Sequence, residues 1–360
     1  MSKAIDSNRP LPWLSATVLI MDTLLHTPHW GIRLRYNRLM MSEFQLIEHY
    51  FRREPRAAGP VRLGVGDDCA LLKVPEGETL AISTDMLVEG RHFFAGADPF
   101  ALGHKTLAVN LSDLAAMGAR PLGFTLALSL PAADADWLRA FSTGLLGLAD
   151  THQIELIGGD TTRGPLNLCV TAFGSVPEGE ALRRKGACPG DEIWVSGTLG
   201  DAKLALSMLL GDIALEADLL TVAAKRLHTP TPRTALGIAL RGIASAAIDI
   251  SDGLSGDLGH ILAQSGAGAI VNADALPLGQ ALSRRALREK REFAASGGDD
   301  YELCFCAPAQ MHSAVLEAGR RSQTTVTCIG RISAEPGLQW LDDTGQALTL
   351  FCRSFDHFAS

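Results

Sequence analysis

Apolar residues follow two different spacings along the chain, and the two spacings alternate. Short apolar runs typical of strands occupy residues 61–65, 80–82, 122–130, 154–157, 168–176, 192–195, 246–250 and 303–306. Between several of these runs, apolar residues recur every three or four positions. This spacing predicts helices over 100–117 and 134–151, a helix beginning at Asp201, and another after the turn 230–233. Strands that alternate with helices in both halves predict an α+β or α/β protein.

Residues 1–40 do not fit this pattern. The apolar run 14–25 is interrupted by polar residues and is too short for a membrane span, and no small-residue cleavage site follows it. A second methionine, Met41, precedes an amphipathic segment. The predicted buried face of this segment comprises Phe44, Ile47, Tyr50 and Phe51. We interpret 1–40 as a non-core extension, either disordered or upstream of the true start.

A segment rich in glycine, proline and charge, 177–190, predicts a domain boundary. A chain of 360 residues is long enough for two domains. We therefore expect an N-terminal domain at 41–178 and a C-terminal domain at 179–360.

Composition and charge narrow the possible functions. The apolar content of 47% is ordinary for a globular protein, and the net charge of −8 argues against a nucleic-acid-binding face. An acidic protein also repels phosphorylated ligands unless divalent cations are bound with them. The seven cysteines are scattered without C-x₂-C pairs, which disfavours zinc sites and disulfides and indicates reduced thiols in a cytoplasmic protein.

Aspartates flanked by glycine, serine or threonine follow several predicted strands. They are Asp67, Asp68, Asp85, Asp160, Asp249, Asp252, Asp299 and Asp300. One such aspartate is usually a turn or helix-cap residue. Their recurrence at five places favours a shared site, because strand ends bring acids to one edge of a sheet. Mg²⁺ takes only one or two carboxylates and completes its shell with water and phosphate. Many separate aspartates therefore fit several Mg²⁺ ions beside phosphorylated substrates.

The helix predicted at 100–117 carries a polar stripe. Thr106, Asn110 and Asp113 are spaced i, i+4 and i+7 and lie on one face. A solvent-facing stripe and a metal site both remain possible from this spacing. The apolar residues around Asp113 favour a metal ligand.

Familiar phosphotransfer and hydrolase motifs do not occur in the sequence. There is no G-x-x-x-x-G-K-[ST] loop, no H-R-D or D-F-G set, and no serine-hydrolase or H-E-x-x-H motif. The glycine-rich segment 64–69 lacks the third glycine of a dinucleotide fingerprint. The aspartates therefore predict an ATP-dependent, Mg²⁺-using phosphotransferase of another type.

Seven motifs in one order resemble the thiamine-monophosphate kinases, a family within the aminoimidazole-ribotide-synthetase-like ATP enzymes. The motifs are GVGDDCA at 64–70, STD at 83–85, NLSDLAAMGA at 110–119, GGDTT at 158–162, DISDGL at 249–254, GGDDYEL at 297–303 and DHF at 356–358. The resemblance extends from about Met41 to the end of the chain. It implies a two-domain PurM-like fold in which the N-terminal domain forms a dimeric β-barrel with its copy, beside a C-terminal α/β domain.

The resemblance also implies a reaction and its residues. ATP would phosphorylate thiamine monophosphate directly, giving thiamine diphosphate and ADP, in a homodimer that needs neither nucleic acid nor membrane. The implied Mg²⁺ ligands are Asp68, Ser83, Thr84, Asp85, Asp113, Asp160, Asp249 and Asp252. The implied ATP contacts are Gly159, Asp160, Arg184 and Ser251. The implied acceptor contacts are His92, Asp299 and Phe355. By pattern alone, His92 and Arg184 would be surface residues and Phe355 a core residue.

One position departs from the family pattern. The family often has glutamate where this chain has Asp299, whose side chain is one methylene shorter. Two alternatives also stay open: a ribotide cyclo-ligase-like enzyme of the same superfamily, and a non-catalytic sensor of nucleotide and Mg²⁺. A selenium-activating relative would show a reactive cysteine in an N-terminal glycine-rich loop, and a carbamoyl-dehydrating relative would end in cysteine. This chain ends in Ser360 and shows neither feature.

Overall fold

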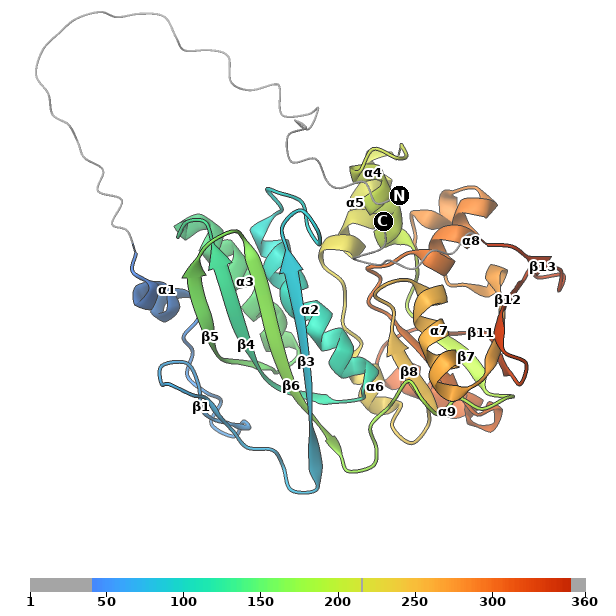
Figure 1. Cartoon of the computed structure of the whole chain (residues 1–360), viewed down its shortest axis with the longest axis horizontal. Helices are drawn as coiled ribbons and strands as arrows, with labels where there is room; N and C mark the ends of the chain where they lie inside the picture. Colours follow the sequence, from blue (N-terminus) through green and yellow to red (C-terminus); the bar gives the residue numbers. More distant parts are fainter. Residues whose placement is uncertain (1–40, 215, 351–360) are drawn as a thin grey trace, which may run out of the picture.

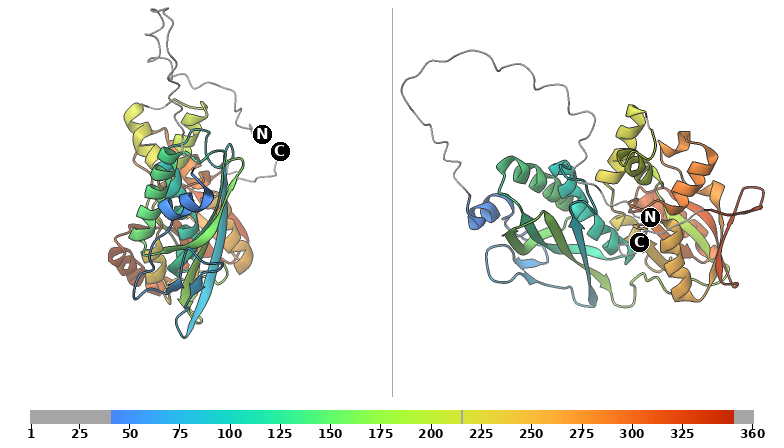
Figure 2. Two further views of the ribbon diagram at one scale, coloured as in Figure 1. Left: turned by 90° about the vertical axis from the view of Figure 1, so that its left-hand side faces the viewer. Right: turned by 45° about the horizontal axis from the view of Figure 1, so that its top comes forward.

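The N-terminal unit is a four-stranded sheet with two helices on one face. The computed structural model describes residues 41–214 and 216–350, so the predicted extension 1–40 and the predicted acceptor contact Phe355 lie outside the described residues. In spatial order the strands are β3 (Glu78–Val88), β6 (Asn167–Pro177), β4 (Arg120–Leu130) and β5 (Glu155–Arg163). β4 and β5 are parallel, and the other neighbours are antiparallel. Helices α2 (Pro99–Ala116) and α3 (Ala135–Thr151) cover one face and leave the other bare (Figure 1, Figure 2).

Leucine and phenylalanine side chains join these helices to the sheet. Leu107 and Leu111 of α2, Phe141 of α3 and Phe124 of β4 are fully buried, and burial of each contributes about 1.5–3 kcal/mol. The two helices cross very closely at Gly103. A Cβ atom added there would lie only 2.1 Å from the Phe141 carbonyl oxygen. This contact fixes α2 firmly on α3.

A short N-terminal segment packs beside α3 and β5. It contains helix α1 (Glu43–Tyr50) and strands β1 (Val61–Leu63) and β2 (Leu71–Leu72). The predicted buried face of α1 is wrong in part. Leu46, Tyr50 and Phe51 are buried, whereas Phe44 is 79% exposed. The segment offers two overlapping apolar stripes, and the one containing Leu46 packs into the core of the N-terminal unit.

The C-terminal unit is a seven-stranded mixed sheet with helices on both faces. In spatial order its strands are β13 (Ala347–Leu348), β12 (Gly337–Leu341), β9 (Gly268–Asn272), β11 (Val326–Ser333), β7 (Glu192–Ser196), β10 (Leu303–Ala307) and β8 (Ala246–Asp249). Only the pairing of β12 with β9 is parallel. The helices are α4 (Asp201–Leu209), α5 (Ala217–His228), α6 (Thr234–Ala239), α7 (Leu254–Ser265), α8 (Leu287–Ser296) and α9 (His312–Arg321). Short 3₁₀ helices cover Ala273–Ala275, Leu282–Arg284 and Ala309–Met311.

One face of the larger sheet forms part of the contact between the two units. Trp194 of β7 and Phe305 of β10 stack with their ring centroids 6.4 Å apart. They share a buried cluster with residues of α6 and α9 and with Ala115 at the end of α2. A Cβ atom at Gly237 of α6 would lie 2.0 Å from the Ala115 carbonyl oxygen. Helix α2 is therefore held by both units, as its central position in Figure 1 shows.

The predicted strands and helices are present, with two differences that affect the site. β3 continues through Asp85 to Val88, and β5 continues through Asp160 to Arg163. These two aspartates lie inside strands, so their prediction as strand-end residues is wrong. The hydrophobic pattern could not show this, because both strands are polar around these aspartates, at Ser83–Asp85 and Asp160–Arg163.

The four-stranded sheet is open in the single chain. β3 and β5 form its two edges, and no closed barrel occurs in the described part of the N-terminal unit. Over residues 41–214 and 216–350, no helix combines the length and hydrophobicity needed to cross a bilayer.

Candidate functional site

Two neighbouring acids form the centre of the candidate site. Side chains alternate along a strand, so Ser83 and Asp85 of β3 both point toward α2, where they meet Asp113. The Ser83 hydroxyl donates a hydrogen bond to Asp113 Oδ2. Asp85 and Asp113 also share a side-chain hydrogen bond. The polar stripe on α2 is therefore not a solvent-facing one, since Thr106 and Asn110 are also buried.

A third acid reaches this centre from the other unit. Asp249 is the last residue of β8, is 5% exposed, and accepts a 2.8 Å hydrogen bond from Ser112 Oγ. Burial, and then repulsion by Asp113, raises the pKa of Asp249 to about 8. Burial, and then repulsion by Asp113, likewise raises the pKa of Asp85 to about 7. Burial also raises the pKa of Asp113. The three carboxyls thus compete for protons when no cation neutralises them.

The donor atoms in this centre suit Mg²⁺. They are hydroxyl and carboxylate oxygens, which are the ligands that this ion prefers. The amide oxygen Oδ1 of Asn110, one turn from Asp113, is buried and has no hydrogen-bond partner among the described residues. In the described part of the chain, no three acidic, histidine or cysteine side chains are placed so that they could together hold one metal ion. This arrangement fits Mg²⁺ ions that each take one or two carboxylates, and it does not fit a closed protein cage.

Two loops of the C-terminal unit are paired beside Asp249. Asp299 N donates to Ser251 O and Tyr301 N donates to Ile250 O, both at 2.9 Å. Asp299 and Tyr301 have positive φ angles of 67° and 49°, a region that is costly for residues other than glycine. The pairing locks the 249–253 segment against 298–302. Asp257 of α7 fixes the first segment by accepting hydrogen bonds from the backbone N–H groups of Ser251 and Asp252.

A buried ion cluster holds the second loop in place. Glu302 is fully buried and its carboxylate accepts hydrogen bonds from Arg226, Arg233 and Ser196. Arg226 also donates to the Asp300 carbonyl oxygen. Sequence analysis missed this cluster, although a run of three polar residues directly before an apolar strand was a usable signal. The two arginines give no local signal, because they come from α5 and from the turn before α6.

Some predicted site residues lie near the acidic centre and others lie apart. Arg184 is close enough to Asp113 to lower its pKa. Gly159 and Asp160 lie on β5, three strands from Asp85, and the strand register puts Gly159 in the same row as Asp85. Three inter-strand steps correspond to about 14 Å. Gly159 and Asp160 therefore do not lie at the acidic centre formed around Asp85.

The remaining predicted residues occupy loops or the bare face. Asp68 is exposed in the loop after β1, and Thr84 is exposed on the bare side of β3, where its hydroxyl lies 3.0 Å from that of Thr171. His92 follows β3, and its Nδ1 accepts a hydrogen bond from Val88 N. Asp299 pairs with Lys105, a residue that sequence analysis did not single out.

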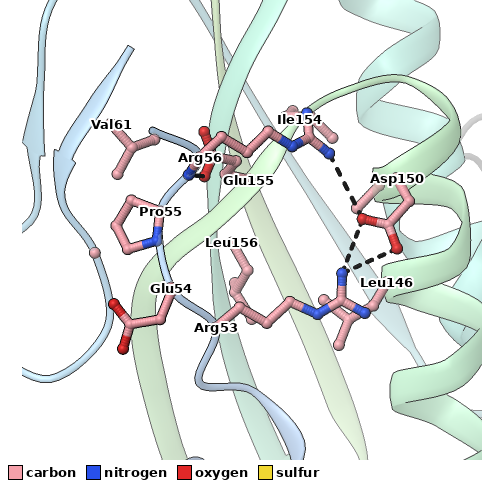
Figure 3. A pocket seen from close by; sticks show the side chains of 12 residues that line it. Arg53, Glu54, Pro55, Arg56, Val61, Leu146, Asp150, Ile154, Glu155 and Leu156 are labelled. Carbon is pink, nitrogen blue, oxygen red and sulfur yellow. Dashed lines mark hydrogen bonds and ion pairs between the residues drawn. The ribbon is translucent and has the colours of Figure 1, made fainter. Parts of the chain in front are cut away.

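A pocket of about 120 Å³ lies elsewhere, between α3, β5 and residues 53–64 (Figure 3). Arg53 and Arg56 both pair with Asp150, at 2.9 and 3.5 Å. Both arginines of this pocket are thus paired with an acid that also lines it, and none of the predicted site residues lines the pocket. We therefore place the functional site at the acidic centre.

Known proteins with similar sequences share this arrangement of two units. The model described as AIR synthase related protein, N-terminal domain, matches residues 66–176, and the corresponding C-terminal domain matches 188–341. The thiamine-monophosphate kinase of Salmonella typhimurium is 49% identical over 326 residues, covering 88% of this chain and 98% of the relative. The chain belongs to the thiamine-monophosphate kinase family. This membership confirms the resemblance seen in the motifs and the two-domain PurM-like fold.

Solved structures of the family agree with the observed architecture. A thiamine-monophosphate kinase from Stenotrophomonas maltophilia superimposes with a TM-score of 0.75 at 49% identity, covering 81% of this chain and 93% of that one. A second structure, "AaThiL complexed with AMPPCP and TMP", superimposes with a TM-score of 0.68 at 29% identity, covering 82% and 92%.

Proposed function

We propose that this family member transfers the terminal phosphoryl group of ATP to thiamine monophosphate, giving thiamine diphosphate and ADP. The observation that carries the proposal is the cluster of Asp85, Asp113 and Asp249, in which burial, and then repulsion by Asp113, raises the pKa of acids from both units. Family membership supports the reaction, and the relative with AMPPCP and TMP supports the pair of substrates. An acidic centre of this kind suits two phosphorylated substrates that arrive with divalent cations.

In this proposal Asp85, Asp113, Asp249 and Ser83 hold Mg²⁺ at the junction of the units. When bound, Mg²⁺ supplies positive charge that reduces the repulsion between the donor and acceptor phosphates. The motif positions Asp68, Thr84, Asp160 and Asp252 lie outside this centre and would hold further Mg²⁺ ions. Asp85 and Asp249 must lose their protons to serve as ligands. No general base is required, because the attacking acceptor oxygen is already anionic.

Substrate contacts follow from the same motifs. We assign Gly159, Asp160, Arg184 and Ser251 to ATP. We assign His92, Asp299 and Phe355 to the acceptor. Arg184 has support from the structure, because its positive charge offsets part of the burial-driven rise in the pKa of Asp113.

The bare face of the four-stranded sheet supports a homodimer in which two sheets combine as a barrel. Along β3, the side chains of Leu80, Ile82 and Met86 are 37%, 60% and 52% exposed. An exposed apolar stripe on a long edge strand is unfavourable in a monomer. Pairing with a second copy would cover it.

The proposed domains are 41–178 and 179–360, and the proposed location is the cytoplasm.

A direct turnover assay tests the reaction. Protein, ATP, Mg²⁺ and thiamine monophosphate are incubated, and thiamine diphosphate and ADP are separated by chromatography. Equal amounts of both products are expected, and omission of Mg²⁺ or of the acceptor should abolish them. Product from another phosphorylated acceptor alone would favour a different enzyme of the superfamily. Nucleotide binding without any product would favour a sensor.

A further inference from the structure

Helix α2 carries a buried lysine near the acidic centre that no part of the proposed mechanism uses. The side chain of Lys105 is 6% exposed, and its Nζ lies 2.7 Å from Asp299 Oδ1. Lys105 is seven residues before Ser112, which corresponds to almost two whole turns, so the two side chains leave α2 on the same side. Ser112 donates a hydrogen bond to Asp249, and Lys105 forms an ion pair with Asp299. One side of α2 thus reaches both segments of the paired loops.

The position of Lys105 along α2 separates it from the acidic centre. Eight residues of helix between Lys105 and Asp113 correspond to about 12 Å. Its ammonium is held by Asp299 and lies 5.9 Å from the centroid of the Tyr301 ring. These contacts hold the Lys105 ammonium at Asp299 and Tyr301, away from Asp113.

Asp299 keeps acceptor capacity after these contacts. Its carboxylate binds Lys105 and shares a hydrogen bond with Tyr301, and an ionised carboxylate offers about four acceptor positions. The side chain is 28% exposed, so part of it can be reached by a ligand. Lys105 is the ion-pair partner of Asp299. Burial, and then repulsion by Lys105, lowers the pKa of His228 beside this pair.

We propose that Lys105 is a positioning residue for the acceptor, which orients Asp299 so that its carboxylate accepts a hydrogen bond from the amino group on the pyrimidine ring. This inference rests on the proposed function, because it assumes that thiamine monophosphate occupies the site. The strained backbone at Asp299 and its ion pair with Lys105 together fix the position of the Asp299 carboxylate. The backbone at Asp299 is fixed by its bond to Ser251 O, and Lys105 fixes the side chain from the opposite unit. A buried lysine without its carboxylate would be costly, so the pair has one stable arrangement.

The test compares Lys105→Met with Lys105→Arg and Asp299→Asn in the full-length protein. Lys73→Met is the matched control, because Lys73 is exposed at the end of β2. KM is measured separately for each substrate. Because a site built around a hydrogen bond discriminates strongly against its loss, Lys105→Met should raise KM for thiamine monophosphate about tenfold or more. KM for ATP should change less than about twofold, and arginine should restore part of the loss.

Oxythiamine monophosphate, which has a carbonyl oxygen in place of the amino group, supplies a second measurement. The wild-type protein should prefer thiamine monophosphate, and Lys105→Met and Asp299→Asn should both lose most of that preference. An unchanged KM for thiamine monophosphate in folded Lys105→Met, or equal increases for both substrates, would overturn the inference. If Lys105→Met does not fold, unchanged discrimination by Asp299→Asn would overturn it as well.

Calorimetric titration with the two acceptor phosphates separates this inference from the proposed reaction. A wild-type protein that binds thiamine monophosphate in preference to the oxo analogue but gives no thiamine diphosphate would refute the reaction and leave the positioning role supported. Equal binding of the two compounds, or no binding of either, would refute the positioning role.

Discussion

Ser112 Oγ of α2 lies 2.8 Å from Asp249 Oδ2 at the end of β8. This hydrogen bond joins the two units at the place where Asp85, Asp113 and Asp249 meet. Helix α2 also makes a close backbone contact with α3 through Gly103 and with α6 through Gly237. The acids are therefore positioned by one rigid helix, and the consequences of changing them can be stated for each residue.

Replacing Asp113 by asparagine should have opposite effects on activity and on the stability of the metal-free protein. Turnover should fall about 10²-fold or more, the cost of losing one electrostatic stabiliser. In the presence of a chelator the free energy of unfolding should rise, because a like charge beside Asp85 and Asp249 is removed. Steady-state kinetics and urea unfolding in EDTA measure the two effects. A variant that loses both activity and stability would contradict this account.

The stability of the metal-free protein should decrease as the pH rises. The pKa values of Asp85 and Asp249 are raised to about 7 and about 8 in the folded protein. The folded state therefore binds more protons than the unfolded chain above pH 4. The stabilisation is complete below the unfolded pKa and is lost as the pH approaches 8. Urea unfolding in EDTA should show this decrease between pH 5 and 8, and Asp113→Asn should reduce it.

Binding of Mg²⁺ should release protons for the same reason. At pH 7 the Asp85 and Asp249 carboxyls are still partly protonated, and a metal ligand must be ionised. The affinity for Mg²⁺ should therefore increase between pH 6 and 8. Calorimetry in two buffers of different ionisation enthalpy measures the protons released. An identical heat in both buffers at pH 7 would contradict proton release.

Replacing Glu302 by glutamine should destabilise the protein and misplace the paired loop. Arg226 and Arg233 would remain buried without their carboxylate, and breaking such a buried cluster costs about 3–5 kcal/mol. Thermal unfolding should show the loss. The exposed pair of Arg139 and Asp136 provides a control, because Asp136→Asn should change stability by less than about 1 kcal/mol. Similar effects of the two changes would show that the cluster is not important.

Placing a charge on the bare face should separate the proposed dimer. Ile82 is 60% exposed at the centre of the apolar stripe on β3, and Ile82→Glu would bury a carboxylate at the interface. Light scattering after size-exclusion chromatography should change from two copies to one. Leu71→Glu is the control, because Leu71 is 57% exposed on β2 and lies outside the sheet. A wild-type protein that is monomeric at micromolar concentration would contradict the dimer.

The sequence predicted most of the N-terminal unit, because strands and helices there have clear apolar periods. α2, α3, β4 and β6 begin and end close to their predicted positions. The C-terminal unit was predicted less completely. Its β9, α7 and α9 pack through small residues and short apolar stretches, and these give weaker patterns than the long leucine-rich helices.

In the site, too, some residues could be predicted from the sequence and others could not. Asp85, Asp113 and Asp249 could be predicted from the sequence, because local spacing and composition single them out. Lys105 and Glu302 were missed because their roles depend on partners far away in the sequence. Lys105 meets Asp299 across 194 residues, and Glu302 meets Arg233 across 69. Such pairings are set by how the units pack, which a single sequence does not reveal.

The alternation of side chains along β3 has a consequence for changes in chain length. Ser83 and Asp85 face the acidic centre, whereas Leu80, Ile82, Thr84 and Met86 face the opposite side. Inserting or deleting one residue before Asp85 would exchange the two faces, so that methionine or threonine would point at Asp113. Individual substitutions on either face leave the other face intact. A substitution in this strand should therefore impair one face only, whereas a change in residue number should impair both faces.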